Sequence, residues 1–229
     1  MSRHTIAGLP PVTSSEVAIP PLGLAGTLSV PKQPIGLVVF AHGSGSSRHS
    51  PRNTAVARAL NSDGFATLLF DLLTAQEESD RANVFDISLL AERLVEVVQW
   101  LDGQGRLIAE LPIGLFGAST GAAAALVAAA RLPEHISAVV SRGGRPDLAG
   151  DALPLVRAPT LLIVGGADLQ VIELNDEAFD QLRAPKAMKI VEGATHLFPE
   201  PGAMDAVIRH AAGWFDRYLR KPRRSSTKP

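Results

Sequence analysis

The sequence predicts an α/β fold: a doubly wound, mostly parallel sheet with an antiparallel N-terminal edge. Two observations lead to this prediction. Short, continuous apolar runs are typical of strands buried on both faces of a parallel sheet. Helix-like segments alternate with those runs, as they do in doubly wound sheets. The 229 residues suit a single domain, because one α/β domain often has roughly 200–250 residues.

The strands are predicted in chain order from their apolar patterns. Two alternating stretches at the N-terminal side predict an edge hairpin, at residues 12–19 and 22–30. Continuous apolar runs then predict buried strands at residues 35–41, 65–70, 112–116, 136–140 and 160–164, with a weaker one at 187–191. Each run is short and follows a turn or a helical segment, which favours strands over buried helices.

Helices are predicted between the strands from caps and helical periodicity. The segments are residues 51–62, 84–101, 119–131, 171–182 and 204–219. Ser50 is a candidate N-cap, and Pro51 suits the first helical position. Within 84–101 the apolar residues recur at helical spacing. Segment 119–131 is small and apolar on all sides, so we expect it to be buried.

Composition and charge exclude several classes of protein. The net charge of -1 argues against broad nucleic-acid binding, which needs a basic field. The absence of cysteine excludes disulfides and a thiol nucleophile. The longest apolar stretch, 121–130, is shorter than the ~20 residues of a membrane span, and no secretory signal pattern is seen near Met1. We therefore expect a cytoplasmic protein without nucleic-acid or membrane partners.

The pentapeptide Gly-Ala-Ser-Thr-Gly at 117–121 is the strongest chemical signal. This G-x-S-x-G pattern follows a predicted strand and begins a predicted helix, which is the setting of a nucleophile elbow. The glycines permit the tight turn. The helix N-terminus favours a developing negative charge. Ser119 is therefore the candidate nucleophile, with an ordinary helix N-cap as the alternative.

A serine nucleophile needs a base and a residue that orients the base. Asp168 and His196 each follow a predicted strand and come after Ser119 in the order Ser, Asp, His. Both would therefore lie at the carboxyl edge of the sheet, where open α/β sheets place their sites. Glu173 and Asp176 are rivals of Asp168, but they fall inside the next predicted helix. For His196, a histidine on a surface loop is the alternative.

Four motifs in order resemble the α/β-hydrolase superfamily, and within it the dienelactone hydrolase-like group. They are His-Gly-Ser-Gly at 42–45, the pentapeptide at 117–121, Gly-Gly-Ala-Asp at 165–168 and Gly-Ala-Thr-His-Leu-Phe at 193–198. The resemblance covers roughly residues 12–220 and implies the α/β-hydrolase fold without a cap domain. It also implies an oxyanion hole formed by the backbone N–H groups of Ser44 and Thr120. Dienelactone hydrolases proper use a cysteine nucleophile, so a chain without cysteine favours a serine carboxylesterase instead.

The expected organisation is one domain, residues 1–220, followed by a flexible basic tail, 221–229. The expected activity is hydrolysis of a small-molecule carboxylic ester, of the EC 3.1.1 type, through an acyl-enzyme. The resemblance implies no metal and no organic cofactor. Two alternatives stay open: the same triad acting on thioesters or amides, and a non-catalytic binding or regulatory module on this fold. The oligomeric state stays open too.

Several polar residues near the predicted site are candidates for substrate binding. Arg48 and His49 follow the 42–45 loop closely, and Arg142 ends the strand next to the elbow. An arginine there could hold a substrate carboxylate with two hydrogen bonds, or it could stabilise the loop. Segment 72–83 is a candidate flap over the entrance. His42 is expected to be a structural hydrogen-bonding residue.

Overall fold

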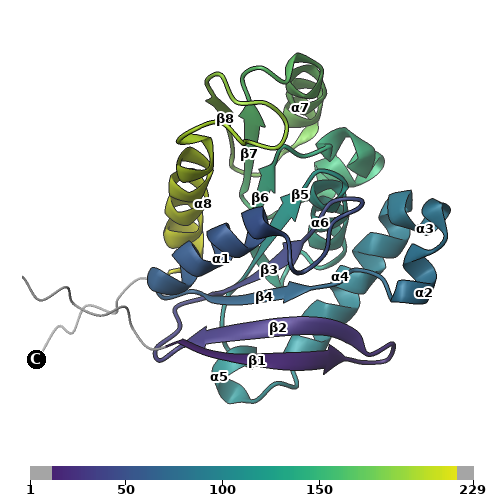
Figure 1. Cartoon of the computed structure of the whole chain (residues 1–229), viewed down its shortest axis with the longest axis vertical. Helices are drawn as coiled ribbons and strands as arrows, with labels where there is room; N and C mark the ends of the chain where they lie inside the picture. Colours follow the sequence, from purple (N-terminus) through teal and green to yellow (C-terminus); the bar gives the residue numbers. More distant parts are fainter. Residues whose placement is uncertain (1–11, 221–229) are drawn as a thin grey trace, which may run out of the picture.

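The computed structural model describes residues 12–220, which contain one eight-stranded sheet in the order β1-β2-β4-β3-β5-β6-β7-β8 (Figure 1). The strands are β1 Val12–Ile19, β2 Leu24–Pro31, β3 Leu37–Ala41, β4 Ala66–Phe70, β5 Ile113–Ala118, β6 Ile136–Arg142, β7 Thr160–Gly165 and β8 Lys186–Val191. β1 pairs with β2, and β2 with β4, in the antiparallel sense. All other neighbours are parallel. The predicted fold class is thus confirmed.

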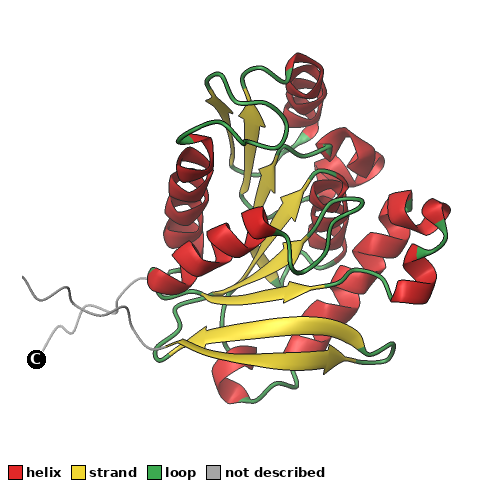
Figure 2. Cartoon of the chain, in the orientation of Figure 1, coloured by secondary structure: helices red, strands yellow, loops and turns green. Residues whose placement is uncertain are grey.

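Helices cover both faces of the sheet (Figure 2). They are α1 Pro51–Ser62, α2 Ala75–Glu78, α3 Arg81–Phe85, α4 Ile87–Leu101, α5 Arg106–Ala109, α6 Thr120–Arg131, the 3-10 segment η1 Pro146–Leu155, α7 Leu169–Gln181 and α8 Ala203–Leu219. One core lies between the sheet and α4, α6 and α7, and the other between the sheet and α1 and α8. Alternate residues of β3 face the two cores, with Val39 in the first and Val38 in the second. This follows because successive side chains of a strand point to opposite faces of the sheet.

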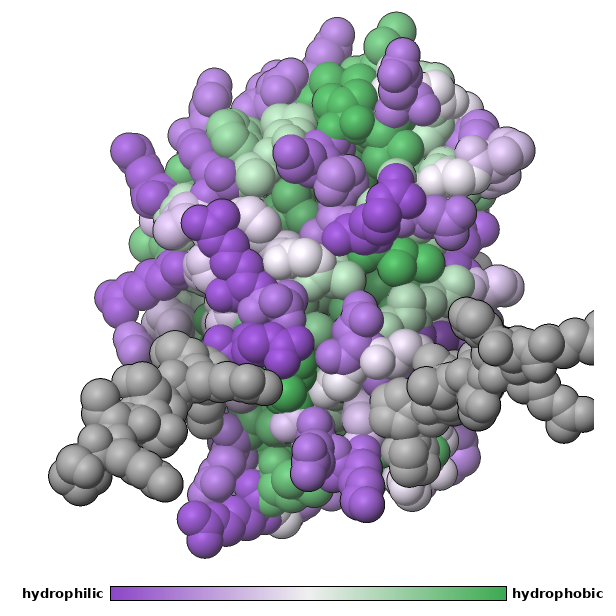
Figure 3. All heavy atoms as spheres, turned by 90° about the vertical axis from the view of Figure 1, so that its left-hand side faces the viewer, coloured by the Kyte–Doolittle hydropathy of each residue, from purple (hydrophilic) through white to green (hydrophobic). Residues whose placement is uncertain are grey.

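The outer surface of α8 is polar because its apolar residues recur every fourth position. Its buried side chains are Ala203, Val207, Ala211, Phe215 and Leu219, which form one stripe toward the sheet. The molecular face on this side is covered largely by hydrophilic side chains with scattered apolar ones between them (Figure 3). Among residues 12–220, every helix is too short or too polar to cross a bilayer.

The structure differs from the prediction mainly in the connection from β4 to β5. The predicted helix 84–101 is two helices, because Asp86 ends α3 and its side chain then caps α4 by accepting from the Leu89 N–H at 3.0 Å. The short helices α2 and α5 and the segment η1 were not predicted, since four to ten residues show too little periodicity. The predicted basic tail, 221–229, lies outside the described residues.

Glycines let α6 begin directly against the sheet. A Cβ atom added to Gly117 would lie 2.4 Å from Ala122 Cα, and one added to Gly121 would lie 2.3 Å from the Ala41 carbonyl oxygen. Real Cβ atoms do not approach backbone this closely. The glycines of the pentapeptide are therefore required by the contacts among β3, β5 and α6, as the sequence predicted.

We expect Gly121→Ala to lower the free energy of unfolding by about 3 kcal/mol, because the added methyl group would overpack a backbone contact. Denaturant unfolding would measure the change. Gly213→Ala in α8 is the matched control, since nothing lies within 4 Å of its added Cβ. That control should gain up to about 1 kcal/mol from helix propensity. Equal unfolding midpoints for the two variants would contradict this packing.

Candidate active site

Ser119 lies at the sharp bend between β5 and α6 with backbone angles of φ 51° and ψ -123°. A positive φ is uncommon for a residue with a side chain, and it is maintained here by three backbone hydrogen bonds. The Ser119 N–H donates to the Arg142 carbonyl, and the Ser119 carbonyl accepts from Arg145 and Ala122. The bend thus has the strained geometry of a nucleophile elbow.

Asp168 and His196 are brought together across two neighbouring loops. The Asp168 Oδ2 atom lies 2.7 Å from His196 Nδ1. The loops after β7 and β8 are joined by backbone hydrogen bonds from Gly166 to Val191 and from Ala167 to Ala194. A carboxylate on Nδ1 fixes the ring orientation and leaves Nε2 available as a base. The structure thus places the two predicted residues in contact.

A second carboxylate supports the His196 loop. Glu200 Oε1 accepts hydrogen bonds from the Thr195 N–H at 3.1 Å and from the Thr195 hydroxyl at 2.6 Å. The hydroxyl bond is the main reason why the pKa of Glu200 lies below its usual range. Phe198 closes the same turn at φ 56° while its ring is buried. The sequence analysis did not identify Glu200, although a threonine before the histidine and an acid shortly after it are a usable local signal.

The end of β6 lies beside both Ser119 and His196. Arg142 pairs with Ala118 in the sheet register, and a Cβ atom on the next residue, Gly143, would lie 3.8 Å from His196 Cε1. Among the described residues, no hydrogen bond within 3.5 Å joins Ser119 Oγ to the imidazole. Catalytic hydrogen bonds of this kind are often long in a free enzyme and shorten when substrate binds.

The loop after β3 packs directly on the elbow. A Cβ atom on Gly43 would lie 2.9 Å from Ser119 Cβ and 3.6 Å from Ser119 Oγ, so only glycine allows this approach. The adjacent Ser44 N–H donates to Thr120 Oγ1 at 3.0 Å. The two residues that the family resemblance placed in an oxyanion hole are therefore in contact, through a side chain that the sequence analysis did not consider.

His42 is a structural residue, as predicted. Its Nε2 accepts the Leu72 N–H at 3.1 Å, so the proton of the neutral ring is on Nδ1, which lies 3.0 Å from the Gly43 carbonyl oxygen. Burial lowers the pKa of His42 and outweighs the opposite effects of Gly43 and Asp71. The neutral ring thus ties the 42–45 loop to the residues that follow β4.

A small pocket of about 20 Å³ borders this loop, which is room for about one water molecule. Gly43 and Ser44 form one wall, while Leu72, Leu73 and Val84 are among the apolar residues of the other. Because Gly43 contacts Ser119, the pocket lies next to the elbow.

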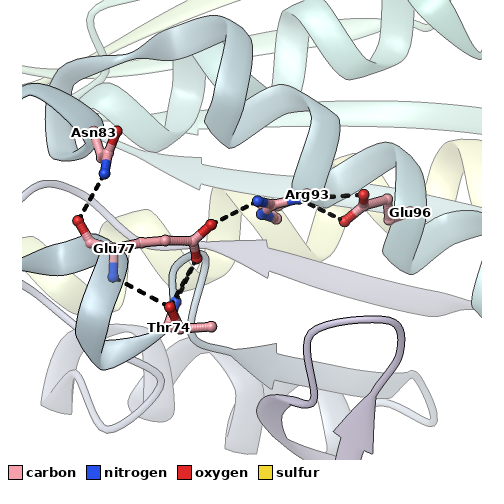
Figure 4. A network of polar contacts seen from close by, with 5 residues as sticks. All are labelled: Thr74, Glu77, Asn83, Arg93 and Glu96. Atoms are coloured by element: carbon pink, nitrogen blue, oxygen red, sulfur yellow. Dashed lines mark hydrogen bonds and ion pairs between the residues drawn. The ribbon is translucent and has the colours of Figure 1, made fainter.

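The candidate flap, 72–83, contains α2 and leads into α3, and a polar network attaches it to α4 (Figure 4). Arg93 of α4 contacts Glu77 at 2.7 Å and Glu96 at 3.0 Å. Glu77 also accepts from the Thr74 N–H and hydroxyl, and its own carbonyl accepts from Asn83. Burial would raise the pKa of Glu77, but the hydrogen bonds from Thr74 and Arg93 lower it overall. This network anchors the segment beside the pocket.

Neither Arg48 nor His49 lines the pocket beside Ser44, although His49 lines an adjoining hollow with Gly45 and Ser46. Both Arg48 and His49 line a separate groove of about 520 Å³ between the β1–β2 hairpin and α1. The Arg48 guanidinium pairs with Asp71 and, at 3.7 Å, with Glu16. Asp71 borders the pocket beside Ser44 and Glu16 belongs to β1, so the Arg48 guanidinium is held between the pocket and the hairpin and does not itself line the pocket.

Arg142 is a buried structural residue, the alternative that the sequence analysis had raised. Its side chain donates to Asn53 Oδ1 at 3.3 Å and lies 5.9 Å from the centre of the Phe198 ring. Burial, with a smaller effect from the charge of Arg52, lowers the pKa of Arg142 to about 10. Arg142 thus links α1 to the turn that follows His196.

No cluster of three or more His, Cys, Asp or Glu side chains that could hold a metal ion occurs among residues 12–220. The groups at this edge of the sheet are a serine, an imidazole with its carboxylate, and backbone amides. Such a set can perform nucleophilic and general acid–base chemistry.

The chain belongs to the α/β-hydrolase fold family, whose sequence pattern matches residues 36–174. A crystal structure of dienelactone hydrolase from Anabaena variabilis ATCC 29413 is 53% identical, with a TM-score of 0.87 over 93% of this chain and all of that one. Within the family, the chain is therefore dienelactone hydrolase-like. The esterase domain of a Rhodothermus marinus protein is 25% identical, with a TM-score of 0.71 over 91% of this chain and all of that one.

Two curated relatives from Mycobacterium tuberculosis strains are 58% identical over 215 residues, which is 93% of this chain. Both have provisional names as phosphoribosyl transferases. The matched region is 48% of their length, so the chain spans about half of each relative.

Proposed function

We propose that the protein is a serine hydrolase that cleaves carboxylic esters through an acyl-enzyme on Ser119. The observation that carries the proposal is the 2.7 Å contact between Asp168 and His196 at the sheet edge where Ser119 adopts its strained bend. Ordinary packing needs neither an oriented imidazole nor a strained serine beside it, whereas acyl transfer needs both.

In the first half-reaction, Ser119 Oγ attacks the ester carbonyl and His196 Nε2 accepts the hydroxyl proton. Asp168 stabilises the resulting imidazolium through Nδ1. The negative charge on the carbonyl oxygen is stabilised by the Thr120 N–H at the start of α6 and by the adjoining Ser44 loop. The imidazolium then protonates the departing alcohol. Water, activated by the same imidazole, attacks the acyl-enzyme and releases the carboxylic acid.

The size of the pocket beside the 42–45 loop favours a substrate with a small acyl group. Its volume of about 20 Å³ holds little more than a methyl-sized group, and its walls include Leu72 and Val84. We propose that the acyl group of the substrate enters this pocket and that the alcohol lies toward solvent. The substrate class is then a small-molecule ester with a short acyl chain.

We do not extend transferase activity to this chain. The transferase name belongs to two longer relatives, and this chain spans about half the length of each. The residues that meet at the sheet edge here have the types and the chain order that acyl transfer requires. The Anabaena variabilis and Rhodothermus marinus relatives are named for lactone and ester hydrolysis, and both share the whole fold.

Hydrolysis of p-nitrophenyl acetate, butyrate and octanoate tests the proposal. We expect an initial burst of about one equivalent of p-nitrophenol per protein, with acetate cleaved fastest because the pocket is small. A matched acetyl thioester and acetyl anilide would show whether other acyl donors are used. Release of p-nitrophenol at the rate of buffer alone from all three esters would contradict the proposal.

A further inference from the structure

The Ser44 amide is already engaged in the free protein. Its N–H donates to Thr120 Oγ1 at 3.0 Å, across a sequence separation of 76 residues. Thr120 is only 5% exposed, so this hydroxyl is enclosed between the loop after β3 and the start of α6. A direct hydrogen bond from the Ser44 amide to a substrate would require this contact to break.

The Thr120 hydroxyl retains a proton that it can donate. A hydroxyl has one donor and two acceptor sites, and a backbone N–H can only donate. Thr120 Oγ1 must therefore be the acceptor in its bond with Ser44. Among the hydrogen bonds of residues 12–220, none uses this hydroxyl as a donor. Its O–H is thus available on the residue that directly follows Ser119.

The backbone amide of Thr120 is available at the same place. It is the first residue of α6, and the first N–H groups of a helix have no intrahelical acceptor. Thr120 therefore offers two donors, its amide and its hydroxyl, on the residue that directly follows the candidate nucleophile. Because Ser44 donates to the hydroxyl, it polarises the O–H and makes it a stronger donor.

Resting on the function proposed above, we propose that the Thr120 hydroxyl is a catalytic oxyanion donor. In this arrangement the tetrahedral oxyanion accepts one hydrogen bond from the Thr120 N–H and one from the Thr120 O–H. The Ser44 amide stands behind the hydroxyl and orients it. No proton is transferred, since the hydroxyl proton stays on Oγ1 throughout. The competing arrangement has the hydroxyl rotate away, after which Ser44 N–H contacts the oxyanion directly.

Thr120→Val separates the two arrangements, because valine keeps the shape and the backbone amide but lacks the hydroxyl. If the hydroxyl is the donor, kcat for the best ester should fall by about 10²–10³-fold with little change in KM. Thr120→Ser keeps a hydroxyl and should stay within about fivefold of wild type. If Ser44 donates directly, Thr120→Val frees that amide, and kcat should be unchanged or higher.

Binding of a methylboronic acid, which mimics the tetrahedral state, gives a second readout. Its affinity should fall in parallel with kcat in Thr120→Val, whereas KM for the ester should change little. If Thr120 had only a structural role, the Thr120→Val substitution would change both of these quantities. Thermal unfolding of each variant checks the fold, and Thr120→Ala gives the same expected loss should the valine variant fail to fold.

The controls distinguish this proposal from the function on which it rests. Wild-type turnover that is abolished in Ser119→Ala, together with full activity in Thr120→Val, would overturn only the role of the hydroxyl. Turnover that does not depend on Ser119 would overturn the proposed function and this inference together. Loss in Thr120→Val with activity kept in Thr120→Ser, on top of Ser119-dependent turnover, is the result that the structure predicts.

Discussion

Replacing Ser119 by alanine is expected to reduce kcat/KM for p-nitrophenyl acetate by at least about 10⁴-fold and up to about 10⁶-fold, the range for loss of a triad nucleophile. Without the hydroxyl no acyl-enzyme can form, so only the slow attack of water on a bound ester remains. The initial burst of p-nitrophenol should disappear as well. Steady-state and stopped-flow absorbance measurements would record both effects.

Ser62→Ala is the matched control for this variant. Ser62 is an exposed serine at the end of α1, where its hydroxyl donates only to the Arg58 carbonyl. The substitution Ser62→Ala removes the same hydroxyl group from a position outside the site, so its activity should equal that of the wild type. Both variants should keep the wild-type unfolding temperature within a few degrees, since neither change creates a core cavity. Ser119→Ala with wild-type kinetics would show that the nucleophile lies elsewhere.

Asp168→Asn is expected to lower kcat by about 10⁴-fold while the fold is retained. Asp168 Oδ2 accepts from His196 Nδ1 at 2.7 Å. An amide of the same size either leaves that N–H without its charged acceptor or stabilises the other tautomer, in which Nε2 has the proton and cannot accept one from Ser119. The imidazolium also loses the charge that stabilises it. The burst rate should therefore fall together with kcat.

Asp176→Asn tests the rival assignment in α7, the helix that follows Asp168. Asp176 lies on the exposed side of that helix, and the structure gives it no contact with His196. Its replacement should leave kcat within a factor of two of wild type. A reversed pattern, with loss in Asp176→Asn and not in Asp168→Asn, would refute the assignment of the acid.

The strands were predictable because each is short, apolar and buried on both faces. The pattern at residues 136–140, for example, predicts β6 correctly from its first residue, and the strand then continues to Arg142. The start of α1 follows from its cap: Ser50 accepts from the Asn53 N–H, and Pro51 occupies the first position. Local signals of this kind do not depend on distant parts of the chain.

The rest of the fold and site depends on contacts between residues distant in sequence. The side chain of Asp86 caps α4 and so separates α3 from α4. The apolar periodicity continues across this position, so the sequence pattern does not reveal the break. The bond from Ser44 to Thr120 spans 76 residues, so neither motif indicates it. Similarly, nothing near Arg48 shows that its guanidinium would pair with Asp71 and Glu16.

The order of the motifs predicted which loops would meet, but not how their atoms bond. Asp168 and His196 each follow a predicted strand at the carboxyl edge of the sheet. This arrangement predicts that the two side chains lie close together. The support that Glu200 provides through Thr195 and the link from Arg142 to Phe198 depend on side-chain rotamers, which the packing of the whole edge determines.

Covalent labelling with a fluorophosphonate reports whether Ser119 is an activated nucleophile. The wild-type protein, incubated with the reagent and digested, should show one adduct by mass spectrometry, on the peptide that contains Ser119. Asp168→Asn should label much more slowly, and Ser119→Ala not at all. An unmodified Ser119 in the folded wild-type protein, or an adduct that persists in Ser119→Ala, would contradict the account.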